Sequence, residues 1–315
     1  MVTKVKIKYD YWFFYFLFIL LCCLIVIGIV CFVCREGFEG NKNEKGSKSQ
    51  IPKTIWTYWD DAKSEDIPEV VEKCIKTWRK YNPKYTIVIL NRHNLAEYCS
   101  KAHEILGSKF ADSPQRVSDM VRLCVLYEHG GLWADATMIV QQSLDFIFEE
   151  QESRGFEFYG YTMGDVEKHL HIESWFFGAV PESHFVGLWR DALMEMNEYD
   201  TLEEYLESIV AQGANLDSIT NKIYFLVYCS EQLVLQKLLP AGYAREHFSL
   251  SESEKGPFKF AADHSWDAGS SLDSLCREHK KYRKQPMHKL MGHFRDLIIA
   301  EPARFACLDE TVFRG

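Results

Sequence analysis

Residues 113–140 contain the side chains whose types and spacing could do chemistry. Asp119 and Arg122 stand three positions apart, so on a helix they share one side. Asp135 follows the apolar run Leu132-Trp133-Ala134, which is typical of a strand, and open α/β sheets bind ligands beyond the carboxyl ends of their strands. The helix side with Asp119 and Arg122 can face the same crevice. Spacing alone leaves an alternative open, in which Asp119 and Arg122 form a surface ion pair and Asp135 lies in a turn.

A helix and a strand must position these residues. Ser113 can cap a helix whose first position is Pro114, because the serine oxygen accepts from an exposed N–H group and proline lacks one. Gly130-Gly131 ends this helix before the strand begins. The buried side of the helix is an apolar stripe made of Val117, Met120, Val121, Cys124 and Val125.

The chain before this segment has the pattern of a strand, a helix and a second strand. Residues 54–59 are β-branched and aromatic, residues 68–81 carry apolar residues at helical spacing, and residues 85–90 form a continuous apolar run. We therefore expect an α/β fold with a parallel sheet, in which the strand at 85–90 is buried on both faces. Further along, residues 182–240 carry helical patterns, and residues 249–284 read as either a polar lid or a solvated loop.

The N-terminal part of the chain reads as a membrane anchor. Residues 11–34 contain no charged residue, and a helix of that length would cross a bilayer. The alternative, a cleaved signal peptide, would be shorter and would end in small residues. We expect a short cytoplasmic tail (1–10), a transmembrane helix (11–34), a polar stem (35–50) and a folded domain (51–315). The long domain after the span favours a type II, single-pass protein, although basic residues on the two sides do not decide its orientation.

The composition excludes several classes of protein. The chain has 315 residues, 47% of them hydrophobic, which excludes a disordered chain and a disulfide-rich miniprotein. A single apolar span excludes a polytopic transporter. The formal net charge of −9 argues against nucleic acid as a partner. The cysteines of residues 51–315 are scattered singly without zinc-ligand spacing, so one disulfide is possible, but its pairing cannot be read from the sequence.

Five segments together resemble a known family, the capsular polysaccharide synthesis proteins. These are relatives of the DXD-containing sugar transferases, which include yeast-type initiating mannosyltransferases and clostridial glucosylating toxins. The resemblance extends over about residues 51–295. It rests on residues 118–123 (SDMVRL), 127–137 (YEHGGLWADAT), 51–60 (IPKTIWTYWD), 173–177 (ESWFF) and 287–290 (MHKL).

The resemblance implies a nucleotide-diphospho-sugar transferase with a Rossmann-like GT-A fold, and it implies roles for three catalytic residues. Asp119 would bind ribose or sugar hydroxyls, and Arg122 would bind the sugar or phosphate of the donor. Asp135 stands at the first DXD aspartate and would hold a divalent cation, Mn²⁺ or Mg²⁺, on the diphosphate.

Aromatic and basic residues complete the implied donor site. Trp56 would stack on the nucleotide base, with a place in the core as the equal alternative. Trp133 belongs to the implied donor site, and Trp175 would line the donor or acceptor pocket unless it packs in the core. Lys289 would neutralise the diphosphate.

Thr137 departs from the DXD pattern, because it stands where the second aspartate would be. One carboxylate and one hydroxyl make a poorer site for a hard cation than two carboxylates. The implied metal ligands are therefore Asp135, Thr137 and a histidine, either His288 or His264. The alternative for each histidine is a structural role without a metal ion.

The implied activity is transfer of a sugar from a nucleotide-sugar donor to a glycan, glycolipid or glycoprotein acceptor, by a membrane-anchored enzyme of the Golgi or another secretory membrane. We expect a retaining, cation-assisted reaction; an inverting route would need a base, such as Glu173 or Asp165. The alternatives are an inactive relative that binds nucleotide or glycan, and an anchored scaffold without activity.

Overall fold

The computed structural model describes residues 49–60, 67–163 and 170–314, and they are built on a mixed β-sheet. The strand order is β2-β1-β3-β6-β5-β7. The pairs β1·β2, β1·β3 and β5·β7 are parallel, whereas β3·β6 and β5·β6 are antiparallel. The strands are β1 (Thr54–Tyr58), β2 (Thr86–Leu90), β3 (Gly131–Ala134), β5 (Phe158–Thr162), β6 (Ile172–Ala179) and β7 (Phe248–Glu252), and a separate antiparallel pair consists of β4 (Met138–Val140) and β8 (Met287–Lys289).

Helices pack on both sides of the sheet. The α-helices are α2 (Glu69–Tyr81), α3 (Leu95–Tyr98), α4 (Ala102–Gly107), α5 (Pro114–His129), α6 (Asp145–Arg154), α7 (His184–Met194), α8 (Leu202–Ala211), α9 (Leu226–Leu233), α10 (Tyr243–His247), α11 (Lys259–Ala262), α12 (Ala268–Arg277), α13 (His279–Tyr282), α14 (Gly292–Ala300) and α15 (Pro302–Leu308). Short 3₁₀ or π segments are η1 (Glu195–Glu198), η2 (Val234–Leu238), η3 (Ser253–Lys255) and η4 (Asp309–Phe313).

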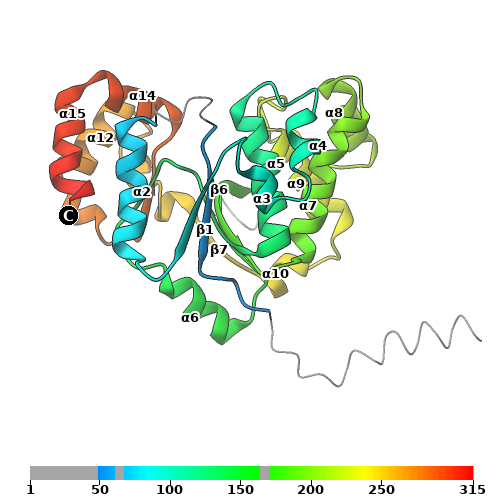
Figure 1. Cartoon of the computed structure of the whole chain (residues 1–315), viewed down its shortest axis with the longest axis horizontal. Helices are drawn as coiled ribbons and strands as arrows, with labels where there is room; N and C mark the ends of the chain where they lie inside the picture. The colour runs from blue at the N-terminus through cyan, green and yellow to red at the C-terminus, as the bar shows by residue number, and fades with distance from the viewer. Residues whose placement is uncertain (1–48, 61–66, 164–169, 315) are drawn as a thin grey trace, which may run out of the picture. The chain divides into compact units, whose positions relative to one another are not determined.

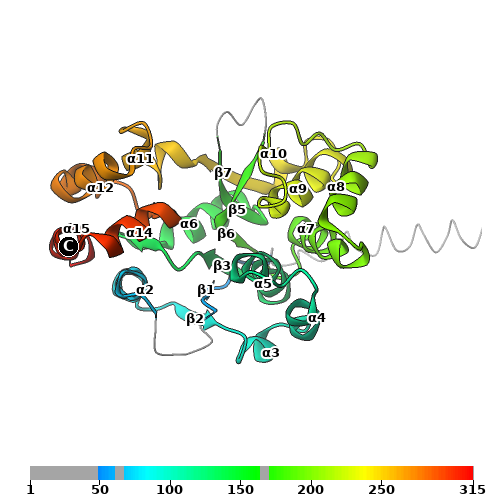
Figure 2. The ribbon, with the colours of Figure 1, turned by 90° about the horizontal axis from the view of Figure 1, so that it is seen from above.

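The sheet separates two hydrophobic cores. Figure 1 shows α2, α12, α14 and α15 on one side of the sheet and α4, α5, α7, α8 and α9 on the other, and Figure 2 agrees. Successive strand residues alternate between the two cores, as the pleat requires. On β3, for example, Leu132 packs with the α2 side and Trp133 with the α5 side, and Phe176 and Phe177 on β6 divide in the same way.

Local sequence rules explain how α5 leads into β3. The Ser113 side chain accepts a hydrogen bond from the Arg116 N–H, and proline occupies the first turn, as predicted. Gly130 and Gly131 have φ of +64° and +104°, in the left-handed region that favours glycine. A Cβ on Gly130 would lie 2.7 Å from Pro181, and one on Gly131 would lie 2.7 Å from the Thr54 carbonyl oxygen. The two glycines therefore allow the tight turn that joins the end of α5 directly to the start of β3.

The predicted α/β class and parallel β1–α2–β2 unit are confirmed, with two corrections. The strand at 86–90 is one of the two edge strands of the sheet, and most of its residues are partly exposed, so the prediction of burial on both faces is wrong. Residues 249–284 are not a loop, because they form β7, η3 and the helices α11 to α13.

The prediction of a type II, single-pass protein of a secretory membrane is corrected. Within residues 49–60, 67–163 and 170–314, no helix is both long enough and apolar enough to cross a bilayer. The expected tail, span and stem, residues 1–50, lie outside the described residues except for residues 49 and 50, and so does Asp165. The start of the folded domain at residue 51 stays a prediction.

One disulfide joins two C-terminal helices. Cys276 on α12 is bonded to Cys307 on α15, with a Cα–Cα distance of 6.0 Å. The bond fixes α15 against α12, on the α2 side of the sheet.

Candidate functional site

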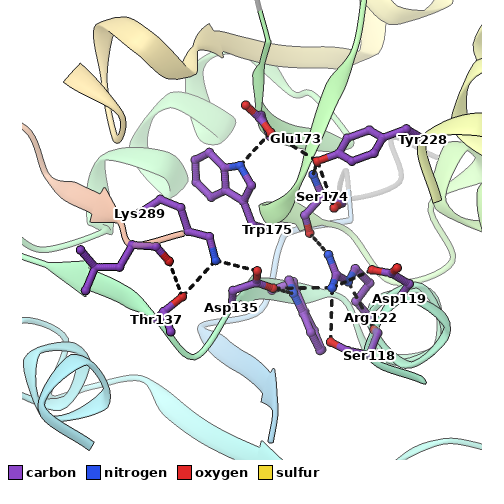
Figure 3. A network of polar contacts seen from close by, with 12 residues as sticks. Ser118, Asp119, Arg122, Asp135, Thr137, Glu173, Ser174, Trp175, Tyr228 and Lys289 are labelled. Atoms are coloured by element: carbon purple, nitrogen blue, oxygen red, sulfur yellow. Dashed lines mark hydrogen bonds and ion pairs between the residues drawn. The ribbon is translucent and has the colours of Figure 1, made fainter. Parts of the chain in front are cut away.

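A network of polar side chains lies at the carboxyl end of β3, where Asp135 is the first residue after the strand (Figure 3). The backbone N–H of Asp135 donates to the carbonyl of Trp175 at 2.8 Å, which joins the end of β3 to β6. Asp119 and Arg122 come from α5, and Lys289 comes from β8. The structure therefore brings the three predicted catalytic residues together from α5 and the end of β3, and it adds the predicted donor-binding Lys289 from β8.

Arg122 is the centre of this network. Its Nη2 lies 2.8 Å from Asp119 Oδ1 and 3.6 Å from Asp135 Oδ1. Its Nη1 donates to the Ser174 carbonyl at 2.5 Å, and Nη2 donates to the Ser118 hydroxyl at 3.2 Å. Arg122 is 4% exposed and Asp119 is 5% exposed. The pair is therefore buried, which removes the alternative of a surface ion pair.

The two carboxylates of the network differ in pKa. Burial raises the pKa of Asp119 to about 6; the attraction of Arg122 opposes this shift and the charge of Asp135 adds to it. Burial also acts to raise the pKa of Asp135, but Lys289 and Arg122 outweigh it and hold this pKa below its ordinary value. Asp135 is thus the carboxylate that stays ionised over the whole physiological range.

Lys289 is fixed beside Asp135 by the pairing of β4 with β8. The register sets Lys289 opposite Met138, next to Thr137 in the chain. Its Nζ donates to Asp135 Oδ2 at 2.7 Å and to Thr137 Oγ1 at 3.1 Å. The Thr137 hydroxyl in turn donates to the Leu290 carbonyl at 2.8 Å. Lys289 is therefore a buried cation beside Asp135, and its role at a diphosphate stays a prediction.

Trp133 positions Asp135. Its indole Nε1 donates to Asp135 Oδ1 at 3.1 Å, and the Arg122 guanidinium lies 5.2 Å from the centre of its ring. The side chain is fully buried. Trp133 therefore acts on the site through the carboxylate that it orients.

A second polar cluster adjoins the first through Ser174. Glu173 is 3% exposed and accepts hydrogen bonds from the Trp175 indole at 2.7 Å, the Ser253 hydroxyl at 2.9 Å and the Tyr228 hydroxyl at 3.3 Å. Burial raises the pKa of Glu173, although these donors oppose the shift. Tyr228 and Ser253 were not predicted from the sequence, because no motif marks them; the only signal nearby was the segment Glu173-Ser174-Trp175, which they contact.

Two aromatic residues of the implied donor site lie mainly in the core. Trp56 is 5% exposed, donates from Nε1 to the Gly130 carbonyl at 2.8 Å, and stacks on His129 with ring centres 5.4 Å apart. Trp175 is 6% exposed and stacks on Tyr161 at 5.6 Å. Both tryptophans therefore lie in the hydrophobic core, which was the alternative to a place in the donor site.

One of the two candidate histidine ligands, His288, is directed away from Asp135. His288 precedes Lys289 on β8, so the alternation of a strand directs it to the opposite side. It is fully buried, meets Gln141 Oε1 at 3.2 Å and packs edge-on against Phe260. Burial lowers the pKa of His288 to about 4. His264 lies 3.5 Å from the Tyr282 hydroxyl.

The residues around Asp135 do not fit a divalent cation. Asp135 Oδ2 accepts from Lys289, and Oδ1 accepts from Trp133 and faces Arg122. Two unit charges about 4 Å apart interact with about 4 kcal/mol at an effective dielectric constant of about 20. A dication at that distance from the Lys289 ammonium would therefore be repelled by about 8 kcal/mol. In the predicted set of Asp135, Thr137 and His288, the carboxylate therefore already faces two cationic side chains, and the histidine points away from it.

A different group of possible metal ligands forms between α3 and α5. Ligand atoms of Cys99, Cys124 and Glu128 all lie within 4.8 Å of one another. Both carboxylate oxygens of Glu128 already accept from the Ser100 N–H, at 3.1 and 3.0 Å. Ser100 lies in the connection between α3 and α4, so the carboxylate has a structural role there. The short-spacing rule for zinc sites could not reveal this grouping, because Cys99 and Cys124 are far apart in the sequence.

Comparison with known proteins gives one family and two curated relatives that match over part of their length. A family model described as capsular polysaccharide synthesis protein matches residues 34–277. Glycosyltransferase afumC of Aspergillus fumigatus (strain CBS 144.89 / FGSC A1163 / CEA10) is 26% identical over 104 residues, which are 30% of this chain and 26% of that protein. O-glycosyltransferase braB of Annulohypoxylon truncatum is 30% identical over 95 residues, 27% of this chain and 22% of that protein. The chain spans about a quarter of the length of these curated relatives.

A solved structure has a similar but distant arrangement. It is a glycosyltransferase involved in the glycosylation of the major capsid of PBCV-1, with a TM-score of 0.43 and 7% identity over 79% of this chain and 98% of that chain. A similarity of this size carries no conclusion about function.

Proposed function

We propose that this chain, which belongs to the capsular polysaccharide synthesis protein family, is a glycosyltransferase that moves a sugar from a nucleotide-sugar donor to a hydroxyl group of a glycan or polysaccharide. The match over residues 34–277 confirms the predicted family. Both curated relatives are named as glycosyltransferases, which supports the enzyme class. We further propose that the mixed α/β fold is of the GT-A type.

The observation that carries this proposal is the network of Asp119, Arg122, Asp135 and Lys289 at the end of β3. A nucleotide-sugar presents hydroxyl groups and a diphosphate. Asp119 and Asp135 can accept hydrogen bonds from hydroxyl groups, and Arg122 and Lys289 can meet the negative charge of the phosphates. Two acceptors and two cations within one network, buried except for the partly exposed Asp135, thus suit both parts of such a donor.

The transfer step follows from these groups. The bond between the anomeric carbon and the phosphate oxygen breaks, and its electron pair stays on the phosphate. The acceptor oxygen bonds to the anomeric carbon, and the acceptor proton passes to the departing nucleoside diphosphate. Cations fixed beside that phosphate stabilise the charge that develops on it.

We propose a retaining outcome, because the network offers no free general base among the residues that the structure describes. Glu173 and Asp165 were the candidate bases for an inverting route. Asp165 lies outside the described residues, and the carboxylate of Glu173 accepts from three side-chain donors. A base must be within hydrogen-bonding reach of the acceptor proton, and these donors occupy the carboxylate. Glu173 is better suited to holding Trp175, Tyr228 and Ser253 in place around the site.

A donor screen tests the proposed function. The full chain is incubated with UDP-, GDP- and CMP-sugars, release of nucleotide is measured, and binding of UDP, GDP and CMP is measured by calorimetry. We expect one nucleotide class to bind and its sugar conjugate to be hydrolysed slowly without an acceptor. Binding without turnover, even with glycan acceptors added, would support the inactive relative. Neither binding nor turnover would reject the proposal.

A further inference from the structure

Lys289 contacts the two residues that the resemblance implies as ligands of a cation on the diphosphate. Its Nζ lies 2.7 Å from Asp135 Oδ2 and 3.1 Å from Thr137 Oγ1. The resemblance places these two residues at the two DXD positions, so they are the ligands that such a cation would need. An ammonium has three N–H donors, and Asp135 and Thr137 account for two of them. One donor is left for a further acceptor.

The backbone holds Lys289 in this position. The Leu290 N–H donates to the Thr137 carbonyl at 3.2 Å, and the Thr137 hydroxyl returns a bond to the Leu290 carbonyl at 2.8 Å. Together with the pairing of β4 and β8, these bonds hold the backbone of Thr137 and of Lys289 in place, so that the two side chains stay in contact. The Lys289 side chain is only 9% exposed. An entering metal ion would therefore have to displace a buried charge rather than a surface lysine.

The ligands themselves are already engaged. Both oxygens of Asp135 accept from N–H donors, Oδ2 from Lys289 and Oδ1 from the Trp133 indole. The Thr137 hydroxyl both accepts and donates. A hard cation prefers several carboxylate or carbonyl oxygens that no cationic group contacts, and at this end of β3 one Asp135 oxygen is bonded to Lys289 and the other faces Arg122.

We infer that Lys289 takes the place of the divalent cation, so that its ammonium, together with Arg122, neutralises the donor diphosphate and sugar transfer needs no metal ion. The inference rests on the proposed function. When the anomeric carbon–oxygen bond breaks, the electron pair goes to the phosphate oxygen, where the third N–H of Lys289 can donate. The bond to the acceptor oxygen forms, and the acceptor proton leaves on the nucleoside diphosphate, so charge and atoms balance without a metal.

The first test removes metal ions. The full chain is stripped with EDTA, and donor hydrolysis is compared in EDTA, in added Mn²⁺ and in added Mg²⁺. We expect rates that agree within assay error. Loss of hydrolysis in EDTA with recovery in either metal overturns the inference and leaves the proposed function standing. Absence of hydrolysis in all three conditions, with no binding of UDP, GDP or CMP, overturns both.

The second test measures metal binding without an activity assay. Mn²⁺ is titrated into the stripped chain, and free Mn²⁺ is followed by electron paramagnetic resonance. We expect the wild type to take up no Mn²⁺ at Asp135, so its titration should match that of Asp135→Asn. The double variant Thr137→Asp, Lys289→Met restores two carboxylates and removes the ammonium, so it should take up Mn²⁺. Uptake by the wild type that Asp135→Asn loses would overturn the inference.

A pair of lysine variants completes the experiment. Lys289→Met should lower donor hydrolysis by about 100-fold or more, because a cation fixed at the developing charge is lost. Lys76→Met removes an exposed lysine of α2 that pairs with Glu72, and it should leave hydrolysis unchanged. Circular dichroism checks that both variants are folded. Equal rates for Lys289→Met and Lys76→Met would count against the role of Lys289.

Discussion

The guanidinium of Arg122 lies 2.8 Å from the carboxylate of Asp119, one helical turn away on α5, and both side chains are buried. Removing one member of a buried ion pair leaves an uncompensated charge in a poorly solvated place, which costs much more than the pair itself contributes. The same guanidinium faces Asp135, so the site and the stability of α5 depend on one side chain.

Arg122→Met should lower the free energy of unfolding by about 3–5 kcal/mol, because Asp119 loses its buried partner. The double variant Asp119→Asn, Arg122→Met should recover part of this loss, since no unpaired charge then remains on α5. Urea denaturation at neutral pH measures both changes. Arg154→Met serves as the control, because its pair with Glu150 is exposed, and exposed pairs contribute about 1 kcal/mol or less. Equal losses for Arg122→Met and Arg154→Met would contradict the buried arrangement.

Asp135→Asn should lower donor hydrolysis on the order of 100-fold or more, while the far-UV circular dichroism stays unchanged. Asparagine keeps the shape of the side chain and an oxygen for the Trp133 indole. It loses the negative charge that holds Lys289 and Arg122 in place. The control, Asp296→Asn, changes an exposed aspartate of α14 that pairs with its neighbour Arg295. Wild-type turnover in Asp135→Asn would exclude this network as the active site.

The α5–β3 unit could be predicted because its local signals agree. Ser113 and Pro114 start the helix, Gly130 and Gly131 end it, and the short apolar strand places Asp135 at a strand end. Each of these features depends on residues close together in the chain. The parallel β1–α2–β2 unit was predictable for the same reason.

Contacts between distant parts of the chain could not be predicted in this way. Lys289 is 154 positions from Asp135, and Tyr228 is 55 positions from Glu173. The sequence at 287–290 offers His288 and Lys289 on opposite sides of one strand, and only the pairing with β4 decides which of them meets Asp135. Burial of β2 was overestimated because an apolar run does not reveal a place at the edge of a sheet.

Trp56→Phe should lower the free energy of unfolding by about 1–3 kcal/mol, because the buried Gly130 carbonyl loses the indole donor. The affinity for the nucleotide that the donor screen identifies should not change, since Trp56 lies in the core between Tyr98 and His129. Trp266→Phe is the control, because Trp266 is 38% exposed and should change stability by about 0.5 kcal/mol or less. A Trp56→Phe variant of normal stability and weak nucleotide binding would restore the base-platform role.

His288 should make the fold sensitive to acid, because burial lowers its pKa to about 4, below the value of about 6.5 in an unfolded chain. The unfolded chain therefore binds the proton first as the pH falls. The contribution of a neutral buried histidine is fully present above pH 6.5 or so and is lost as the pH falls toward 4. The difference of about 2.5 pKa units corresponds to a loss of about 3 kcal/mol across this window.

His288→Gln isolates this contribution, since glutamine can keep a hydrogen bond to Gln141 but does not titrate. Urea denaturation at several pH values between about 4 and 7 should show a smaller loss of unfolding free energy for the variant than for the wild type. Donor hydrolysis at neutral pH should be the same in both, because the histidine faces Phe260 and not Asp135. A variant that loses hydrolysis at neutral pH, with unchanged acid stability, would instead place His288 at the active site as a ligand.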